Sequence, residues 1–268
     1  MKFLTQLFHR NRLTAALAVV VLLPALVLRG RSAPELTVFA AASLTDVMQE
    51  LAVPFEKENG VKIIFNFAGS NTLAQQIVAA PSGADVFLSA SEKWMDTVAA
   101  AGALAEGTRT SVLTNTLVVV AHPASTFSMT RPEDLTTMPF AFLSLGDPDA
   151  VPAGKYARQW LSGVRMGDQT VWDAVRGRVS PAPDVRAALA QVESRDDVVG
   201  VVYRTDFASA KGRVRLIYSV PSSGSLVISY PAAVMKEAPN PALARRFMDY
   251  ITSPEARSVF EKYGFGVQ

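Results

Sequence analysis

The stretch TVFAAASLTD, Thr37–Asp46, decides the fold of this 268-residue chain. It begins with β-branched and aromatic residues, passes through three alanines, and then places apolar residues at Leu44, Val47, Met48 and Leu51. This change of spacing predicts a β-strand, a tight turn and an α-helix. The first N–H groups of such a helix lack partners and lie at the positive end of its dipole, so the turn is suited to an anion.

Ser43 lies in that turn and has two interpretations. Its hydroxyl either adds a hydrogen-bond donor to the helix-start amides or serves only as an ordinary N-cap. The pattern returns after a second predicted strand, 61–68, where Gly69-Ser70-Asn71-Thr72 precedes another helical spacing. Ligands of open α/β sheets bind outside the carboxyl ends of the strands. Two such serines in consecutive units therefore favour a binding site.

The rest of the chain continues to alternate between strand and helix patterns. Strands are predicted at 84–90, 113–121, 140–145, 198–203, 213–220 and 226–235, and helices at about 91–101, 241–252 and 254–263. Asp184 is a predicted N-cap of a further helix. The order of these elements predicts an α/β fold with mostly parallel sheets flanked by helices.

Residues 1–33 have the pattern of a separate leader. Lys2, Arg10 and Arg12 precede the apolar run 13–28, as in a secretory signal peptide, and the run is too short and abruptly ended for a clear membrane span. We expect a signal peptide or N-terminal leader and a periplasmic protein. An uncleaved leader that anchors the protein to the membrane is the alternative.

Composition excludes several classes of site. The chain has no cysteine, which excludes disulfides, thiol catalysis and zinc–thiolate sites. Its two histidines are His9 and His122, so 34–268 contains only one. The leader carries five basic and no acidic residues, which leaves 21 basic and 24 acidic residues and a net charge of −3 in 34–268. The whole-chain charge of +2 is therefore no sign of nucleic-acid binding.

Several short strings carry a resemblance to a known family. They follow one another between residues 36 and 267: Val38–Leu44, Phe67–Ala74, Gly146–Pro148, Val151–Gly154, Asp184–Arg186, Gly200–Tyr203 and Phe260–Phe265. In these strings the chain resembles the periplasmic molybdate-binding proteins of ABC importers. It departs from them at Asn71, where a serine is common, and at Gly163–Gly167, which looks like an insertion.

The resemblance implies a two-lobed, type II periplasmic-binding-protein-like fold with the ligand in the cleft between the lobes. We expect lobe 1 at 34–117 plus 225–268, and lobe 2 at 118–224. The resemblance further implies that hydrogen bonds alone hold molybdate or tungstate. They come from Ser43 and Ser70 of the first lobe, and from the Ala153 and Val185 amides and the Tyr203 phenol of the second. The metal is then contacted only through the oxyanion's oxygens, without direct protein ligands.

The chemistry of these positions agrees with an anion. A fully ionised tetrahedral dianion accepts hydrogen bonds at every oxygen, so its best site offers donors only. No carboxylate acceptor is mapped to the site, which disfavours a protonated ligand such as hydrogen phosphate. We expect Arg186, beside the site, to pair with a surface carboxylate rather than with the anion.

The expected function is that of a monomeric, exported binding protein that closes about a hinge on molybdate or tungstate. It would deliver the anion to membrane ABC permease subunits, without enzymatic activity, cofactor or nucleic-acid partner. One alternative is a protein of the same fold for sulfate, phosphate or a small carboxylate. A second is a serine hydrolase using Ser43 or Ser70, which the lack of a Gly-x-Ser-x-Gly elbow and of a recognisable triad disfavours.

Overall fold

The computed structural model describes residues 33–221 and 226–268. The predicted leader, 1–33, lies outside the described residues except for Ala33, so its role as a signal stays a prediction. In the described ranges no helix has both the length and the apolar character needed to cross a membrane.

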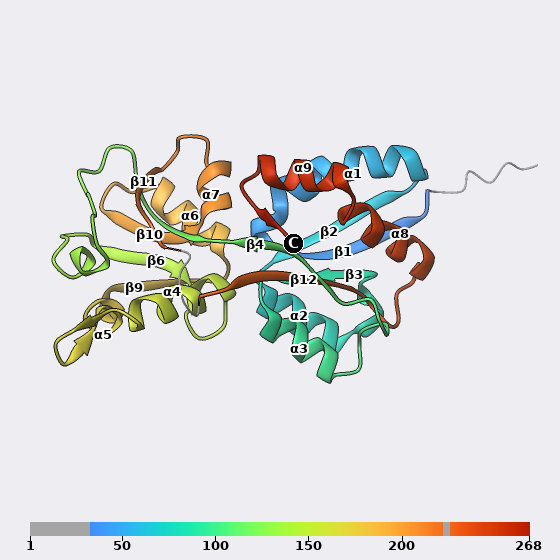
Figure 1. Cartoon of the computed structure of the whole chain (residues 1–268), viewed down its shortest axis with the longest axis horizontal. Coiled ribbons are helices and arrows are strands. Elements are labelled where there is room, and N and C mark those ends of the chain that lie inside the picture. The colour runs from blue at the N-terminus through green and yellow to red at the C-terminus, as the bar shows by residue number, and fades with distance from the viewer. Residues whose placement is uncertain (1–32, 222–225) are drawn as a thin grey trace, which may run out of the picture. The chain divides into compact units, whose positions relative to one another are not determined.

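In the described part of the chain, one sheet has six strands in the order β13-β4-β12-β3-β1-β2. Their bounds are β1 Glu35–Ala41, β2 Lys62–Ala68, β3 Val86–Leu88, β4 Thr110–Asn115, β12 Ile228–Val234 and β13 Gly266–Val267. Figure 1 shows one group of helices on one face, α1 (Thr45–Asn59), α8 (Pro241–Ile251) and α9 (Pro254–Lys262). The opposite face carries α2 (Ser70–Ala79) and α3 (Glu92–Ala100). Each face has its own cluster of buried apolar side chains.

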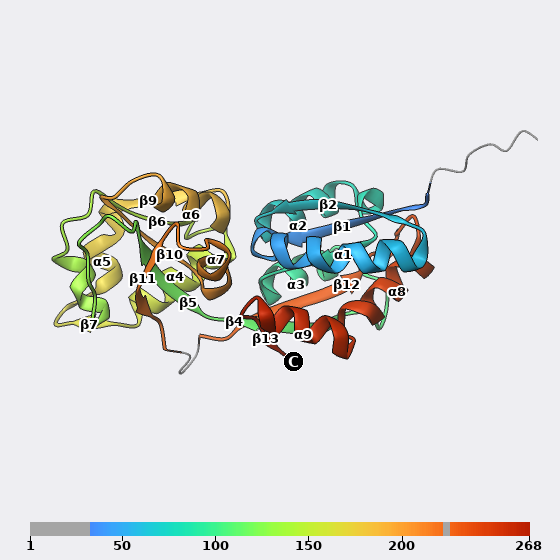
Figure 2. The same ribbon diagram turned by 90° about the horizontal axis from the view of Figure 1, so that it is seen from above.

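A second sheet has five described strands in the order β11-β5-β10-β6-β9. Their bounds are β5 Leu117–Ala121, β6 Phe142–Gly146, β9 Val179–Ala182, β10 Val198–Tyr203 and β11 Arg215–Ser219. Its helices are α4 (Pro152–Ser162), α5 (Val171–Val175), α6 (Val185–Glu193) and α7 (Arg204–Ser209), which both views show around this sheet (Figures 1 and 2). The predicted insertion at 163–167 leads into a two-stranded hairpin, β7 (Arg165–Met166) and β8 (Gln169–Thr170).

Short 3-10 helices complete the chain between these elements. They are η1 Ala42–Leu44, η2 Pro81–Gly83, η3 Pro132–Thr136 and η4 Arg176–Arg178. The strands of the first sheet come from 35–115 and 228–267, and those of the second from 117–219. The exact limits of the lobes, 34–117 with 225–268 and 118–224, stay a prediction.

The expectation of mostly parallel sheets is wrong, because both sheets are mixed. Among the described strands of the two sheets, four neighbouring pairs are parallel and five are antiparallel. The chain crosses from β4 to β5 and returns through β12, and these strands pair antiparallel to their neighbours. The single strand predicted at 113–121 is likewise two strands, since the chain changes sheets at Thr116, whose N–H bonds to Asn115 Oδ1 at 2.9 Å.

Parallel pairing aligns the carboxyl ends of the strands that matter for function. Strands β2 and β3 are both parallel to β1, and the last residues of β1 and β2, Ala41 and Ala68, are paired. In the second sheet β9 and β10 are both parallel to β6, and Gly146 pairs with Ala182 where β6 and β9 end. The loops after three strands of each sheet therefore gather at one edge of that sheet.

Candidate functional site

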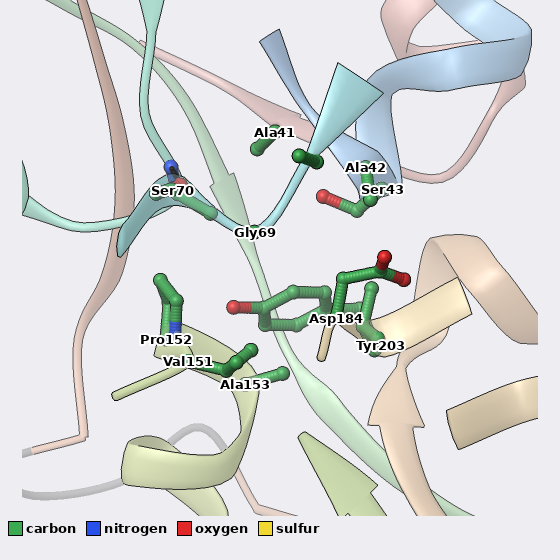
Figure 3. Close-up of a pocket in the computed structure, with 13 residues that line it drawn as sticks. Ala41, Ala42, Ser43, Gly69, Ser70, Val151, Pro152, Ala153, Asp184 and Tyr203 are labelled. Atoms are coloured by element: carbon green, nitrogen blue, oxygen red, sulfur yellow. Dashed lines mark hydrogen bonds between the residues drawn. The ribbon is translucent and has the colours of Figure 1, made fainter. Parts of the chain in front are cut away.

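A small pocket lies where these six strand ends meet (Figure 3). Its volume is about 10 Å³, close to the space that one water-sized sphere needs, so it suits only a compact ligand. The described lining residues are Ala41, Ala42, Ser43, Ala68, Gly69, Ser70, Ala90, Val151, Pro152, Ala153, Asp184, Val185 and Tyr203. All five sequence-predicted positions are among them. That these residues bind a ligand stays a prediction.

The first sheet contributes two buried serines to the pocket. Ser43 lies in η1, directly after β1, and its Oγ is 2.9 Å from the Tyr230 Oη in a buried hydrogen bond. Ser70 is the first residue of α2, and its Oγ accepts the N–H of Ala90 at 2.9 Å. Because the Ser70 oxygen already accepts this bond, its own hydrogen is free to donate into the pocket. The methyl side chain of Ala41 and the absence of a side chain at Gly69 let a ligand approach the backbone beside the serines.

The second sheet contributes the first turns of two helices. Helix α4 begins with Pro152, which has no N–H, so Ala153 carries the first amide of this helix without an intrahelical partner. Helix α6 has Asp184 as its N-cap, as predicted, and the Asp184 Oδ1 accepts the N–H groups of Arg186 at 2.8 Å and Ala187 at 2.9 Å. The cap does not engage the amide of Val185, the first residue of α6.

Tyr203 adds a phenol at the end of β10. The residue is 1% exposed, and its Oη has no hydrogen-bond partner among the described residues. Figure 3 shows its ring on the opposite side of the pocket from Ser43 and Ser70. Burial holds the pKa of Tyr203 well above its ordinary value, so the phenol keeps its hydrogen at neutral pH. A buried hydroxyl without a partner is costly, and a ligand oxygen in the pocket would relieve that cost.

A carboxylate, that of Asp184, does line the pocket, although the resemblance maps no carboxylate acceptor there. The reason is geometric: a side chain that caps α6 must lie at the same helix start that presents the Val185 amide. Its Oδ1 is engaged by two backbone N–H groups, so the carboxylate is fixed by the cap.

Charge near the pocket is arranged in a bridge of three residues. The Arg186 Nη2 is 2.5 Å from Asp46 Oδ2, and its Nε is 2.8 Å from Asp206 Oδ1. The expected pairing with a surface carboxylate is thus seen at Asp46, which is partly exposed, whereas Asp206 is buried. Burial raises the pKa of Asp206 to about 6 despite Arg186. None of the described lining residues is basic, so an anion in this pocket would be held by hydrogen bonds and helix dipoles.

Three close approaches join elements of the two sheets around the pocket. The indole Nε1–H of Trp94, in α3, donates to the carbonyl oxygen of Ala150 at 3.0 Å. Gly69 lies so close to the loop before α6 that a Cβ at this position would be 2.9 Å from the Pro183 carbonyl oxygen. The ion pair of Arg186 with Asp46 is the third, because Arg186 lies in α6, beside the second sheet, and Asp46 lies in α1, beside the first.

Sequence reasoning missed the residues behind the serines. Tyr230 lies in β12 and Asn115 at the end of β4, and both take part in the hydrogen bonds that reach Ser43. Tyr230 is followed by Pro231, and a proline within a strand pattern can mark a bulge. No signal marks Asn115. Within the described ranges, no group of three or more His, Cys, Asp or Glu side chains could hold a metal ion.

Known proteins match this chain over nearly all of its described residues. The family described as bacterial extracellular solute-binding protein matches residues 36–266. The molybdate-binding protein ModA of Escherichia coli is 41% identical over 238 residues, which cover 87% of this chain and 90% of that protein.

Two solved structures confirm the type II periplasmic-binding-protein-like fold. The periplasmic molybdate-binding protein of Azotobacter vinelandii superposes with a TM-score of 0.75 at 21% identity, over 87% of this chain and 99% of that one. The sulfate-binding protein SubI of Mycobacterium tuberculosis gives the same TM-score at 14% identity, over 87% and 86%. These two structures show the fold alone, whereas the family match and the E. coli relative show the family. The chain therefore belongs to the family of bacterial extracellular solute-binding proteins, as a homologue of the molybdate-binding proteins.

Proposed function

We propose that this protein binds molybdate, and equally tungstate, in the pocket lined by Ser43, Ser70, Ala153, Val185 and Tyr203. The observation that carries the proposal is the chemistry of these positions: hydroxyls, helix-start amides and a phenol, with no basic residue among the described lining. Such a site suits an anion that accepts hydrogen bonds at every oxygen. The 41% identity to a molybdate-binding protein supports this choice of anion.

The energetics are sufficient without a cation in the pocket. Each hydrogen bond to a charged group contributes about 1.5–3 kcal/mol, and two helix starts add their dipoles. Five donors of this kind offset the desolvation of a dianion. Because the donors come from both sheets, an oxyanion bonded to all of them favours the arrangement in which the two sets of loops are close. Hinge closure on the anion follows from this.

The biological role that fits is capture of the anion outside the cytoplasm and its transfer to a membrane ABC permease. The family match and the predicted leader support this role. We infer a monomer that performs no catalysis and uses no cofactor or nucleic acid. His122, the one histidine of 34–268, is not among the described lining residues, and its Nδ1 accepts the N–H of Ala124 at 3.1 Å. A serine hydrolase mechanism therefore has no histidine base among the described lining residues.

Sulfate is the second candidate, because the sulfate-binding protein of M. tuberculosis has the same fold. Phosphate is less suited, since it carries a proton at neutral pH and needs an acceptor. Asp184 is the carboxylate at the pocket, and its Oδ1 already accepts two N–H groups.

The test is thermal unfolding of the purified protein with molybdate, tungstate, sulfate and phosphate in parallel. A ligand of the folded state raises stability by RT ln(1 + [L]/Kd), so a tight ligand gives a large shift. We expect shifts with molybdate and tungstate only. A shift with sulfate or phosphate instead would overturn the choice of anion, and no shift with any of the four would overturn the binding site.

Three substitutions test the residues. Ser43→Ala and Ser70→Ala should each weaken molybdate binding by about tenfold to 150-fold, from the loss of one bond to a charged ligand. Tyr203→Phe should weaken it less, because the pocket wall remains. Ser144→Ala is the matched control: Ser144 is fully buried and its Oγ donates to the Ala188 carbonyl oxygen at 2.9 Å, away from the pocket lining. Unchanged affinity in both Ser43→Ala and Ser70→Ala would overturn the site.

A further inference from the structure

A buried chain of hydrogen bonds leads to Ser43 from outside the pocket. The Asn115 Nδ2 lies 3.1 Å from the Tyr230 Oη and 2.9 Å from the Thr205 Oγ1. The Tyr230 Oη in turn lies 2.9 Å from the Ser43 Oγ. All four residues are at most 8% exposed. Tyr230 and Asn115 do not line the pocket in the described residues, so any effect they have on a ligand passes through Ser43.

The inventory of donors fixes the direction of the bonds that Asn115 makes. The Asn115 Oδ1 accepts the N–H of Thr116 at 2.9 Å, which fixes the orientation of the amide and turns Nδ2 toward Thr205 and Tyr230. The Tyr230 oxygen therefore accepts a hydrogen bond from Asn115. Either oxygen of the Ser43–Tyr230 bond can be its donor, and the phenolic hydrogen of Tyr230 is available for Ser43. Burial keeps the pKa of Tyr230 far above its ordinary value, so that hydrogen is present at neutral pH.

With Tyr230 as the donor of this bond, the Ser43 oxygen accepts it and the Ser43 hydrogen is left for another acceptor. Figure 3 shows the Ser43 side chain directed into the pocket. We propose that Tyr230 is a positioning residue for the anion, which, ordered by Asn115, holds the Ser43 hydroxyl hydrogen toward the ligand. This inference rests on the proposed function, since it assumes that an oxyanion occupies the pocket.

The backbone around Tyr230 supports this role. The register between β12 and β4 shifts at Tyr230 and Pro231, which marks an irregularity of the bulge type in a strand inside the sheet. Such bulges re-aim a side chain and are frequent next to functional sites. The Tyr230 ring is held edge-on between Phe265, at 5.6 Å between ring centroids, and Tyr203, at 6.1 Å. The phenol is thus fixed in one direction by packing as well as by its bonds.

The size of the effect follows from what Tyr230→Phe removes. A free hydroxyl samples three staggered positions, so ordering its hydrogen is worth a factor of about three in affinity. A chain of bonds that polarise one another strengthens each by about 10–30%, which raises the factor further. We expect Tyr230→Phe to weaken molybdate binding about three- to tenfold, as measured by calorimetric titration.

A double-mutant cycle separates positioning from general support of the structure. If Tyr230 acts only through the Ser43 hydroxyl, Tyr230→Phe should cause no further loss in a Ser43→Ala protein. In a Ser70→Ala protein it should cause the same three- to tenfold loss as in the wild type. Tyr250→Phe is the matched control, because it removes a phenol that donates to the Leu51 carbonyl oxygen at 3.1 Å, away from the pocket. It should change affinity less than twofold.

The possible results distinguish a failure of this inference from a failure of the proposed function. Equal losses from Tyr230→Phe with and without the Ser43 hydroxyl, or no loss in the wild type, would overturn the inference while leaving the proposed function intact. Wild-type protein that binds none of molybdate, tungstate, sulfate and phosphate would overturn both. If Tyr230→Phe does not fold, Asn115→Ala enters the same cycle, because it removes the group that orders Tyr230. Losses from Asn115→Ala that add to those of Ser43→Ala would likewise overturn it.

Discussion

Replacing Gly69 with alanine would place a methyl group between the loops of the two sheets. Gly69 is the N-cap of α2 with φ of −59°, a conformation that alanine adopts readily. The new Cβ would lie 2.9 Å from the Pro183 carbonyl oxygen and 2.5 Å from the Asn71 Oδ1. The Asn71 side chain can rotate away, whereas the Pro183 oxygen belongs to the backbone just before α6. The substitution therefore opposes the approach of the two sheets at the pocket.

The magnitude follows from the contact. A carbon–oxygen contact needs about 3.3 Å, so the two loops must separate by about 0.4 Å. Overpacking of this kind costs about 1–3 kcal/mol, which corresponds to a loss of affinity of about fivefold to 150-fold. If the lobes open in the free protein, as the proposed hinge requires, this cost is absent there and appears only in the ligand-bound form. The free protein should therefore melt as the wild type does.

Calorimetric titration with molybdate and thermal unfolding without ligand test this reasoning together. Gly177→Ala is the matched control, because a Cβ at Gly177 meets no atom within 4 Å. Repeating Gly69→Ala in an Asn71→Ala protein removes the side-chain overlap and leaves the backbone one. Affinity at the wild-type level would refute the steric argument, and an equal loss of stability with and without molybdate would refute the hinge.

Two further changes test the surroundings of the pocket. Asp206 has a pKa of about 6 in the folded state, against an ordinary value of 3.8. Between these two pH values the folded protein holds a proton that the unfolded chain has released. The contribution of Asp206 to the free energy of unfolding therefore falls as the pH rises through this range. The melting temperature of the wild type minus that of Asp206→Asn should fall between pH 4 and 6 and level off above, and a rise would contradict the assignment. Trp94→Phe removes the donor to the Ala150 carbonyl oxygen and should weaken molybdate binding about two- to twelvefold in calorimetry, the worth of one neutral hydrogen bond. Unchanged affinity would show that this contact persists in the open form.

The sequence predicted the parts of the fold that local patterns control. The change of period at 37–46 is a property of neighbouring residues, and the structure has β1, η1 and α1 there. The Asp184 cap was readable for the same reason. Ser43 and Ser70 could be proposed from their place after strands. Ala153 and Val185 could not, because a backbone amide has no side-chain signature, and they came from the family resemblance alone.

The parts that were missed depend on partners far along the chain. The run from Leu113 to Ala121 is rich in β-branched residues, and the polar Thr114-Asn115-Thr116 in its middle does not by itself show that β4 and β5 enter different sheets. Strand β9 contains Pro181, which argues against a strand, yet β9 lies at the edge of its sheet where a missing N–H is tolerated. The balance of parallel and antiparallel pairs follows from these crossings.

What makes the pocket a donor site is set by the same long-range pairing. A serine hydroxyl both donates and accepts, so its residue type does not decide which it offers to a ligand. Ser70 is fixed as a donor because its oxygen accepts from Ala90, at the end of a neighbouring strand unit and 20 residues away. In the arrangement that we propose, Ser43 is fixed as a donor by Tyr230, 187 residues away, which reaches it because β12 returns to the first sheet. The selectivity that we propose for the two serines, toward a fully ionised anion, would therefore be a consequence of sheet topology, and moving either partner should change it without touching the serine.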